Sequence, residues 1–343
     1  QSFYTGALAS RLVTQMQAAG GLWSAADLAE YRAIARKPLT FNYRGHEIIT
    51  MPPPSAGGIV MRQILFASEQ LNFAQAPWRS PQAFHLYVEA TRRAYADRNT
   101  WLGDPGFVQI PVAGLLDPAY ITARMRDIDP AHATPSSSIA AGTPKSESPE
   151  TTHFSVIDAQ GSAVSNTYTL NTGFGAKLVL PGTGILLNNE MDDFAANPGK
   201  PNAYGLVQGE RNKIEPKKRM LSSMTPTLLL KNGQLRAVLG TPGGPTITTT
   251  VVQLVRALID YGVTLDVAVR AGRVHEQWLP DAVIVEPEVE PEIVDGLRAL
   301  GHNVIPSPMG HIGHADCIEV DPATQGFRAV ADVTRDSGGA LAY

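Results

Sequence analysis

A tract rich in proline, serine and threonine, residues 135–150, separates a mainly helical part of the sequence from a part dominated by short strands. Its composition is typical of an exposed, weakly packed connection. A strand-like pattern begins directly after it, at Thr151-Thr152-His153-Phe154. The tract therefore predicts an accessible and severable connection just before Thr151, although an ordinary loop between two strands has the same composition.

The residue that follows the tract has a chemical use if the chain is cut there. Cleavage before Thr151 would leave a strand whose first residue carries both a hydroxyl and a free α-amine. The amine can act as the local base that activates such a weak hydroxyl nucleophile. Nucleophilic catalysis by Thr151 is therefore one hypothesis, and a loop without chemistry is the other.

The pattern of apolar residues favours antiparallel sheets covered by helices. A hairpin is expected over residues 39–51, turning at Arg44-Gly45, and closing strands are expected after Gly310. Helices are expected where apolar residues recur at helical spacing: within residues 3–35 and over 59–71, 84–99, 246–261, 265–270 and 291–300. Because strands and helices do not alternate regularly, an α+β fold is favoured over a doubly wound one.

Size and composition exclude several classes of protein. With 343 residues, 43% of them apolar and 17% charged, the chain can bury a sizeable core as one large domain or two. The net charge of -4 gives no electrostatic footprint for nucleic acid, and no apolar run is long enough to span a membrane. The single cysteine, Cys317, excludes a disulfide framework and a cysteine-based metal cluster. Because Gln1 is not a natural start, we expect that a segment upstream of it is absent.

Polar and glycine-rich clusters follow Thr151 at residues 167–173, 184–194, 220–227 and 240–246. On a strand, Thr169 and Asn171 would share one face and reach one pocket. The acidic turn that ends the second cluster suits an ammonium group, and equally a solvated loop or a calcium site. Gly243 and Gly244 stand directly before an expected helix, where their amides suit an oxyanion, although a helix cap and turn would use the same residues.

A proline run meets two glycines in residues 52–58, directly before the helix expected over 59–71. Such a turn can present its backbone amides to a substrate or a neighbouring chain. A plain connection from strand to helix explains the same residues. The sequence leaves both interpretations open.

Taken together, these stretches resemble the γ-glutamyltransferase (γ-glutamyltranspeptidase) family of N-terminal-nucleophile hydrolases. The resemblance covers nearly the whole chain. The motifs that carry it are Tyr43-Arg44-Gly45, residues 51–58, Ala94-Tyr95-Ala96-Asp97-Arg98, Leu102-Gly103-Asp104-Pro105, residues 151–156, residues 167–171, residues 184–194, Leu221-Ser222-Ser223-Met224, Pro242-Gly243-Gly244 and residues 275–280.

The resemblance implies a four-layer αββα fold with two stacked antiparallel sheets. It also implies a precursor that cuts itself between Glu150 and Thr151. Residues 1–150 would then be the C-terminal part of a large subunit, and residues 151–343 would be the small subunit of the resulting heterodimer.

The implied reaction is γ-glutamyl transfer and hydrolysis on glutathione and other γ-glutamyl compounds, through a threonyl ester, with water, an amino acid or a peptide as acceptor. No metal or organic cofactor is implied. The resemblance assigns the following roles: Thr151 as nucleophile, Thr169 as its hydrogen-bond partner, Gly243 and Gly244 as oxyanion hole, Asn171, Glu190 and Asp193 for the α-amino group, Ser222 and Ser223 for the α-carboxylate, and Tyr204 as the closing aromatic of a lid over residues 197–205.

The chain departs from the family pattern in two ways. It begins after the region in which the family carries an arginine for the α-carboxylate, and that region would also hold any export signal. A periplasmic or secreted location is therefore only an expectation from the family. Pro245 follows the two glycines where many relatives carry serine, which removes one backbone donor beside the expected oxyanion hole. A cephalosporin or glutaryl acylase of the same fold, and a catalytically silent unprocessed fragment, are the alternatives.

Overall fold

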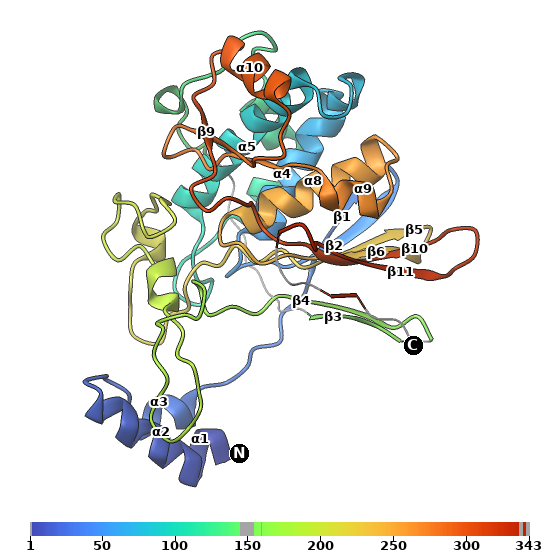
Figure 1. Ribbon diagram of the computed structural model, residues 1–343. Helices are drawn as coiled ribbons and strands as arrows, with labels where there is room; N and C mark the ends of the chain where they lie inside the picture. Colours follow the sequence, from blue (N-terminus) through green and yellow to red (C-terminus); the bar gives the residue numbers. More distant parts are fainter. Residues whose placement is uncertain (1, 145–153, 159, 336–338, 341–343) are drawn as a thin grey trace.

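A six-stranded antiparallel sheet forms the centre of the fold (Figure 1). The computed structural model describes residues 2–144, 154–158, 160–335 and 339–340, so Thr151 lies outside the described residues. In spatial order the strands are β1 (Leu39–Tyr43), β2 (His46–Thr50), β5 (Thr227–Lys231), β6 (Gln234–Leu239), β10 (Asp316–Val320) and β11 (Phe327–Ala331).

The sheet joins the two parts of the chain that the polar tract separates. β1 and β2 form the predicted hairpin, in which Tyr43 pairs with His46 across Arg44-Gly45. Both turn residues have positive φ, 47° and 75°, as a tight hairpin turn requires. β2 then pairs antiparallel with β5, which lies far beyond the tract. The parts before and after the tract therefore share one sheet and one core.

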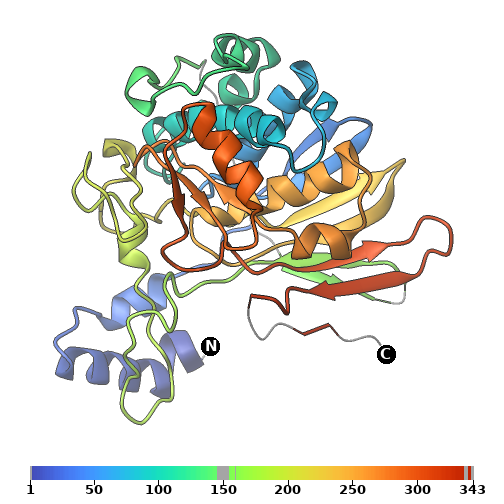
Figure 2. The same ribbon diagram turned by 45° about the horizontal axis from the view of Figure 1, so that its top comes forward.

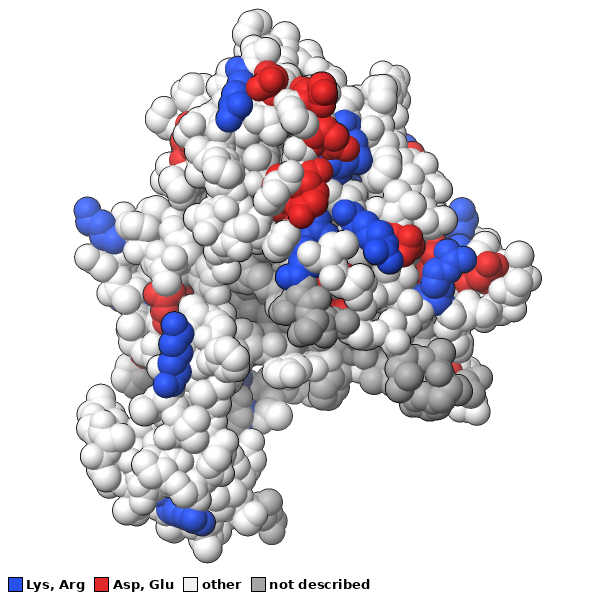
Figure 3. Space-filling model, in the orientation of Figure 1, with Lys and Arg blue, Asp and Glu red and all other residues white. Residues whose placement is uncertain are grey.

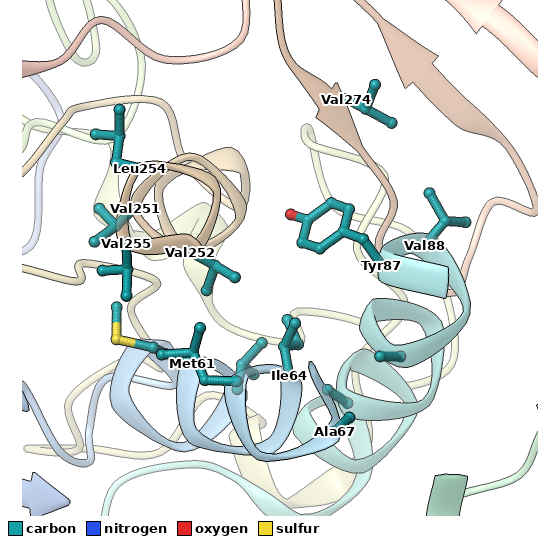
Figure 4. Packing of buried hydrophobic residues seen from close by; sticks show 14 of the residues in the cluster. Met61, Ile64, Ala67, Tyr87, Val88, Val251, Val252, Leu254, Val255 and Val274 are labelled. Atoms are coloured by element: carbon teal, nitrogen blue, oxygen red, sulfur yellow. The ribbon is translucent and has the colours of Figure 1, made fainter. Parts of the chain in front are cut away.

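Three long helices cover one face of this sheet: α4 (Gly57–Gln70), α5 (Pro81–Trp101) and α8 (Thr246–Asp260). Figure 4 shows Met61 and Ile64 of α4 facing Val252 of α8, with Tyr87 of α5 beside them. All four side chains are buried. Complete burial of one such side chain stabilises the fold by about 1.5–3 kcal/mol. The helical spacing of the sequence therefore identified this core face correctly.

A hairpin of β3 (Phe154–Ile157) and β4 (Ala163–Asn166) lies against the other face of the central sheet, next to β5 and β6 (Figure 1). It contributes strands to a second layer. The α+β class with antiparallel sheets covered by helices is confirmed.

A third small sheet differs from the prediction. β7 (Val274–His275) pairs antiparallel with β8 (Val283–Val285), but β8 pairs parallel with β9 (Val304–Pro306). Helix α10 (Pro291–Ala299) makes the crossover between the parallel strands. Strands of two and three residues are too short to show a period in the sequence, so this unit was not predicted.

The first three helices stand apart from the main core (Figure 2). They are α1 (Ser2–Thr5), α2 (Ala7–Ala18) and α3 (Ala25–Glu30). Ser24 caps α3, because its side chain accepts a hydrogen bond from the Asp27 amide in a capping box. Leu12 of α2 packs against Leu180 and Leu187, so these helices support the segment that leads into the acidic turn.

The remaining described elements are short: η1 (Phe73–Gln75), α6 (Val112–Leu116), α7 (Pro118–Met125), η2 (Ser136–Ser138), η3 (Glu190–Asp193), η4 (Glu210–Asn212) and α9 (Leu265–Arg270). Helices α6 and α7 were not predicted. Among the described residues no helix combines the length and the apolar character needed to cross a bilayer. On the face shown in Figure 3, acidic and basic side chains lie beside one another and are not separated by sign.

Candidate active site

Three of the predicted polar clusters, together with the last residue of the acidic turn, meet in one recess with about 470 Å³ of space free of atoms. Of the predicted site residues, seven line it directly: Thr169, Asn171, Asp193, Ser222, Ser223, Gly243 and Gly244. Thr167, Tyr168, Leu206, Met224, Pro242, Pro245 and Ile247 complete the lining. Thr151 lies outside the described residues, so the recess can be described only without it.

Two glycine amides at the start of α8 form the donor side of the recess. Gly243 has φ 138° and Gly244 has φ 58°, conformations that residues with side chains rarely adopt. A Cβ on Gly244 would lie 2.7 Å from Cε1 of Tyr204, so space as well as conformation requires glycine. No hydrogen bond from either amide to another described residue is found. With the positive end of the α8 dipole behind them, these amides suit a developing oxyanion.

Pro245 fits this turn without disturbing it. It is the N-cap of α8 with helical backbone angles, a position at which a proline is tolerated. Its carbonyl accepts a hydrogen bond of 2.6 Å from the hydroxyl of Tyr95, a buried residue of α5. This hydrogen bond therefore ties the glycine turn to helix α5.

Thr169 and Asn171 reach the recess, but not by the predicted geometry. β4 ends at Asn166, and Asn171 has φ 76°, so the two residues do not lie on one strand face. The chain instead turns back on itself, because the Asn171 amide donates to Oγ1 of Thr169 over 2.7 Å. Nδ2 of Asn171 donates to the carbonyl of Asn189, which leaves Oδ1 as an acceptor for a ligand.

The acidic side of the recess is formed by the 3₁₀ helix η3. Glu190 is 9% exposed, and neither of its carboxylate oxygens has a hydrogen-bond partner among the described residues. Burial raises the pKa of Glu190, although Thr169 and the Asn171 amide lie near enough to oppose this effect. Burial and the neighbouring Glu190 raise the pKa of Asp193 to about 7. Two carboxyl groups without a counterion of their own suit a bound ammonium group.

The segment before these residues also departs from expectation. The apolar residues 184–187 have the composition of a buried strand, but they make only an isolated bridge, between Val179 and Leu186. Of the alternatives for the acidic turn, a solvated loop does not fit the burial of Glu190. Within the turn, Glu190 is buried and Asp193 lines the recess, whereas Met191 is exposed.

Ser222 and Ser223 form the third side. Their backbone is fixed by the proline and glycine segment of residues 52–58: Ala56 donates to the carbonyl of Ser222, and Ser222 donates to the carbonyl of Pro54. The amides of this segment are therefore used internally, which favours the interpretation as a structural connection. Oγ of Ser223 accepts a hydrogen bond of 3.0 Å from the buried guanidinium of Arg98.

Tyr204 closes the recess. Its hydroxyl donates to the carbonyl of Asn171 over 2.6 Å, and its ring lies against Gly244. Nε2 of Gln277 donates to the carbonyl of Tyr204 over 3.0 Å and so fixes the loop from the opposite side. The predicted lid residue thus lies across the site.

Sequence reasoning did not identify Arg98 and Gln277 as site residues, although both fall within the motifs of the resemblance. The available signal for Arg98 was its place in the helix expected over 84–99, where it interrupts the apolar side. Gln277 gave no separate signal, because its role depends on a contact with a distant loop.

Several known proteins are similar to this chain in sequence. A family model described as gamma-glutamyltranspeptidase matches residues 1–342. A glutathione hydrolase proenzyme of Escherichia coli strain K12 is 44% identical over 339 residues, which are 95% of this chain and 58% of the relative. The acylase ACY 1 proenzyme of Pseudomonas sp. strain SE83 is 40% identical over 308 residues, covering 90% of this chain and 52% of the relative. The chain thus spans little more than half the length of these relatives.

Solved structures share its fold. A cephalosporin acylase from Bacillus halodurans superimposes with a TM-score of 0.83 at 26% identity, covering all of this chain and 59% of the other. A gamma-glutamyltranspeptidase from Pseudomonas nitroreducens complexed with L-DON gives a TM-score of 0.52 at 41% identity, covering 56% of this chain and all of the other. The fold is that of N-terminal-nucleophile hydrolases. Because this family model matches residues 1–342 and a relative is 44% identical over 95% of this chain, the chain belongs to the gamma-glutamyltranspeptidase family.

Proposed function

We propose that the protein hydrolyses and transfers γ-glutamyl groups, with Thr151 as the nucleophile after self-cleavage between Glu150 and Thr151. Glutathione and similar compounds would donate the γ-glutamyl group. Water, or the amine of an amino acid or peptide, would accept it. The products of cleavage, residues 1–150 and 151–343, would stay together because they share the central sheet.

The register of the β3–β4 hairpin supports the choice of Thr151. Phe154 pairs with Asn166, and Ser155 pairs with Ser165. Three residues back from Phe154 is Thr151, and three residues on from Asn166 is Thr169, which lines the recess. Because β4 ends at Asn166, we propose from this count only that Thr151 and Thr169 act in the same site.

The observation that carries the donor class is the unpaired acidic side of the recess. Asp193 lines one part of it, with the unpartnered Glu190 close to Asp193, whereas the neutral donors Ser222 and Ser223 line another part. A γ-glutamyl group ends in an ammonium and a carboxylate on one carbon, and these charges match the two sides. A glutaryl group lacks the ammonium and would leave both acidic groups unpaired.

The proposed steps conserve atoms and protons. The hydroxyl oxygen of Thr151 attacks the γ-carbonyl carbon, and the threonine's own amine takes the proton. The oxyanion that forms would accept hydrogen bonds from the Gly243 and Gly244 amides. The carbon–nitrogen bond then breaks, and the departing amine takes the proton. Water or an amine acceptor attacks the resulting ester in the same way, which restores the threonine hydroxyl.

The test compares two donors. We expect the full-length protein to release p-nitroaniline from γ-glutamyl-p-nitroanilide with a kcat/KM well above that for glutaryl-7-aminocephalosporanic acid. Asp193→Asn should lower turnover of the first donor by about tenfold or more, because a charge-assisted bond to the ammonium is lost. It should affect the second donor little. Turnover of the glutaryl donor alone would refute the proposal.

An acylase is the second candidate, because the cephalosporin acylase structure superimposes over the whole chain. That activity would require a recess in which the acidic side is neutral or covered. Asp193→Asn would then leave the preferred reaction unchanged or raise it, so the same variant distinguishes the two candidates.

A further inference from the structure

Arg98 is a buried cation for which no described carboxylate forms an ion pair. It is 2% exposed on α5, and it is absent from every salt bridge found among the described residues. Its Nη2 donates to Ser223 and its Nη1 donates to Asn99 and Gln208, whereas its Nε has no partner there. Burial of an unpaired charge is costly, so the fold needs a reason to keep this one.

The bond to Ser223 decides which way that hydroxyl acts. A guanidinium can only donate hydrogen bonds, so Oγ of Ser223 must accept. No described residue accepts a bond from the hydroxyl of Ser223, and its side chain lines the recess. The proton of the hydroxyl can thus be donated to an anionic group inside the recess. The guanidinium lies 3.0 Å from the same oxygen and adds a positive charge.

The same guanidinium also reaches the acidic side. Oε1 of Gln208 accepts from Nη1 of Arg98 over 3.2 Å, and Nε2 of Gln208 donates to the carbonyl of Asp193 over 3.1 Å. Asn212 donates to the same carbonyl over 2.7 Å and to Oε1 of Gln208. One buried cation therefore connects the serine side of the recess with the turn that carries Asp193.

We propose that Arg98 is a positioning residue that makes the site selective for donors carrying an α-carboxylate. It holds Ser223 as a hydrogen-bond donor and places a positive charge behind the carboxylate. The inference rests on the proposed function, since it assumes an α-amino acid group in the recess. It predicts that the loss of Arg98 affects recognition of the carboxylate more than the chemical steps.

The test measures binding and turnover separately. Calorimetry on the full-length protein compares L-glutamate with 4-aminobutyrate, which lacks only the α-carboxylate. We expect the wild type to bind L-glutamate at least about tenfold more tightly, and Arg98→Met to abolish this preference. For γ-glutamyl-p-nitroanilide, KM should rise by about tenfold or more while kcat changes less than about threefold.

Matched variants separate positioning from folding. Arg93→Met removes another buried arginine of α5, one that is paired with Glu89 and Asp127 away from the recess. It should leave the preference for L-glutamate unchanged. Arg98→Lys keeps a charge but not the fork of donors, so it should retain part of the preference. Ser223→Ala alone should reduce the preference as much as the double variant Ser223→Ala/Arg98→Lys does, because the two residues act through one bond.

The outcomes distinguish this inference from the proposed function. If the wild type turns over the γ-glutamyl donor and Arg98→Met or Arg98→Lys keeps the full preference for L-glutamate, the role of Arg98 is refuted and the proposed function stands. Equal losses for L-glutamate and 4-aminobutyrate in both Arg98 variants would also refute it, since that is the result of a purely structural role. If the wild type neither prefers L-glutamate nor turns over the donor, the proposed function fails and this inference fails with it.

Discussion

The acidic side of the recess should weaken the ligand-free fold at high pH. In the folded chain the pKa of Asp193 rises from its ordinary value of 3.8 to about 7, because the carboxyl is buried beside Glu190 and Asp192, with Arg98 partly opposing the rise. The unfolded chain therefore loses this proton near pH 4, whereas the folded chain keeps it until about pH 7. Stability falls with rising pH between these values, because the unfolded state binds fewer protons there.

The size of the effect follows from the shift. Each pKa unit corresponds to about 1.4 kcal/mol, so the whole shift corresponds to about 4 kcal/mol, of which about 3 kcal/mol falls between pH 5 and pH 8. Asp193→Asn removes this titration. When the pH is raised from 5 to 8, we expect the free energy of unfolding of the variant to increase by about 2–3 kcal/mol relative to that of the wild type. Any pH-independent effect of the amide cancels in this comparison.

Urea unfolding of both proteins at the two pH values measures this difference. Asp321→Asn is the matched control. Asp321 is a half-buried acid far from the recess whose pKa is lowered by the amides of Thr324 and Ala323, so it is ionised at both pH values in both states. Its substitution should change stability equally at pH 5 and pH 8. If Asp193→Asn also changes stability equally at the two pH values, then the pKa of Asp193 is not raised in the folded chain, and the reasoning about the acidic side of the recess is wrong.

Two further predictions concern the turn and the lid. Gly244→Ala should lower kcat by about a hundredfold or more, because φ 58° and the ring of Tyr204 leave no room for a Cβ and the amide must move. Gly262→Ala, also at positive φ but with nothing within 4 Å, should cost stability and leave kcat unchanged; a similar loss of kcat in both variants would contradict this. Gln277→Ala should raise KM and speed proteolysis within residues 197–205, since it frees the carbonyl of Tyr204. Unchanged proteolysis there would show that Gln277 does not hold the lid.

Elements with a strong local pattern could be predicted from the sequence. Helix α8 was expected over residues 246–261 and spans Thr246–Asp260, because its apolar side recurs over four turns. The hairpin at Arg44-Gly45 was found because Gly45 favours the positive φ that the turn requires and alternating apolar residues flank it. In both cases the signal lies within a few consecutive residues.

Elements that depend on distant contacts could not be predicted. The parallel pairing of β8 with β9 involves only three residues on each strand, which leaves no readable strand period, although the crossover helix α10 was expected over residues 291–300. The turn that replaces the expected strand at Thr169 and Asn171 combines the local bond from the Asn171 amide to Thr169 with a bond from Nδ2 of Asn171 to Asn189, which lies 18 residues further along the chain. Local propensity was overruled there by tertiary structure.

The residues of the candidate site likewise divide into those that the sequence predicted and those that it did not. The clusters were visible in the sequence, but single residue types did not identify their roles without the resemblance. The residues that hold these clusters in place were not predicted, because they lie on α5, far from the clusters in the sequence. Tyr95 holds the glycine turn and Arg98 holds Ser223. A charged residue on the apolar side of a predicted helix was the only advance sign of this arrangement.

The most direct test of the central claim is mass spectrometry of the full-length protein before and after a brief incubation with a γ-glutamyl donor and an acid quench. We predict two fragments, one of which begins at Thr151. After incubation, the mass of one glutamyl group should be found on the peptide that starts with this residue. Thr151→Ala should give neither the cut nor the adduct. A chain that stays whole yet turns over the donor, or an adduct on any other residue, would contradict the account.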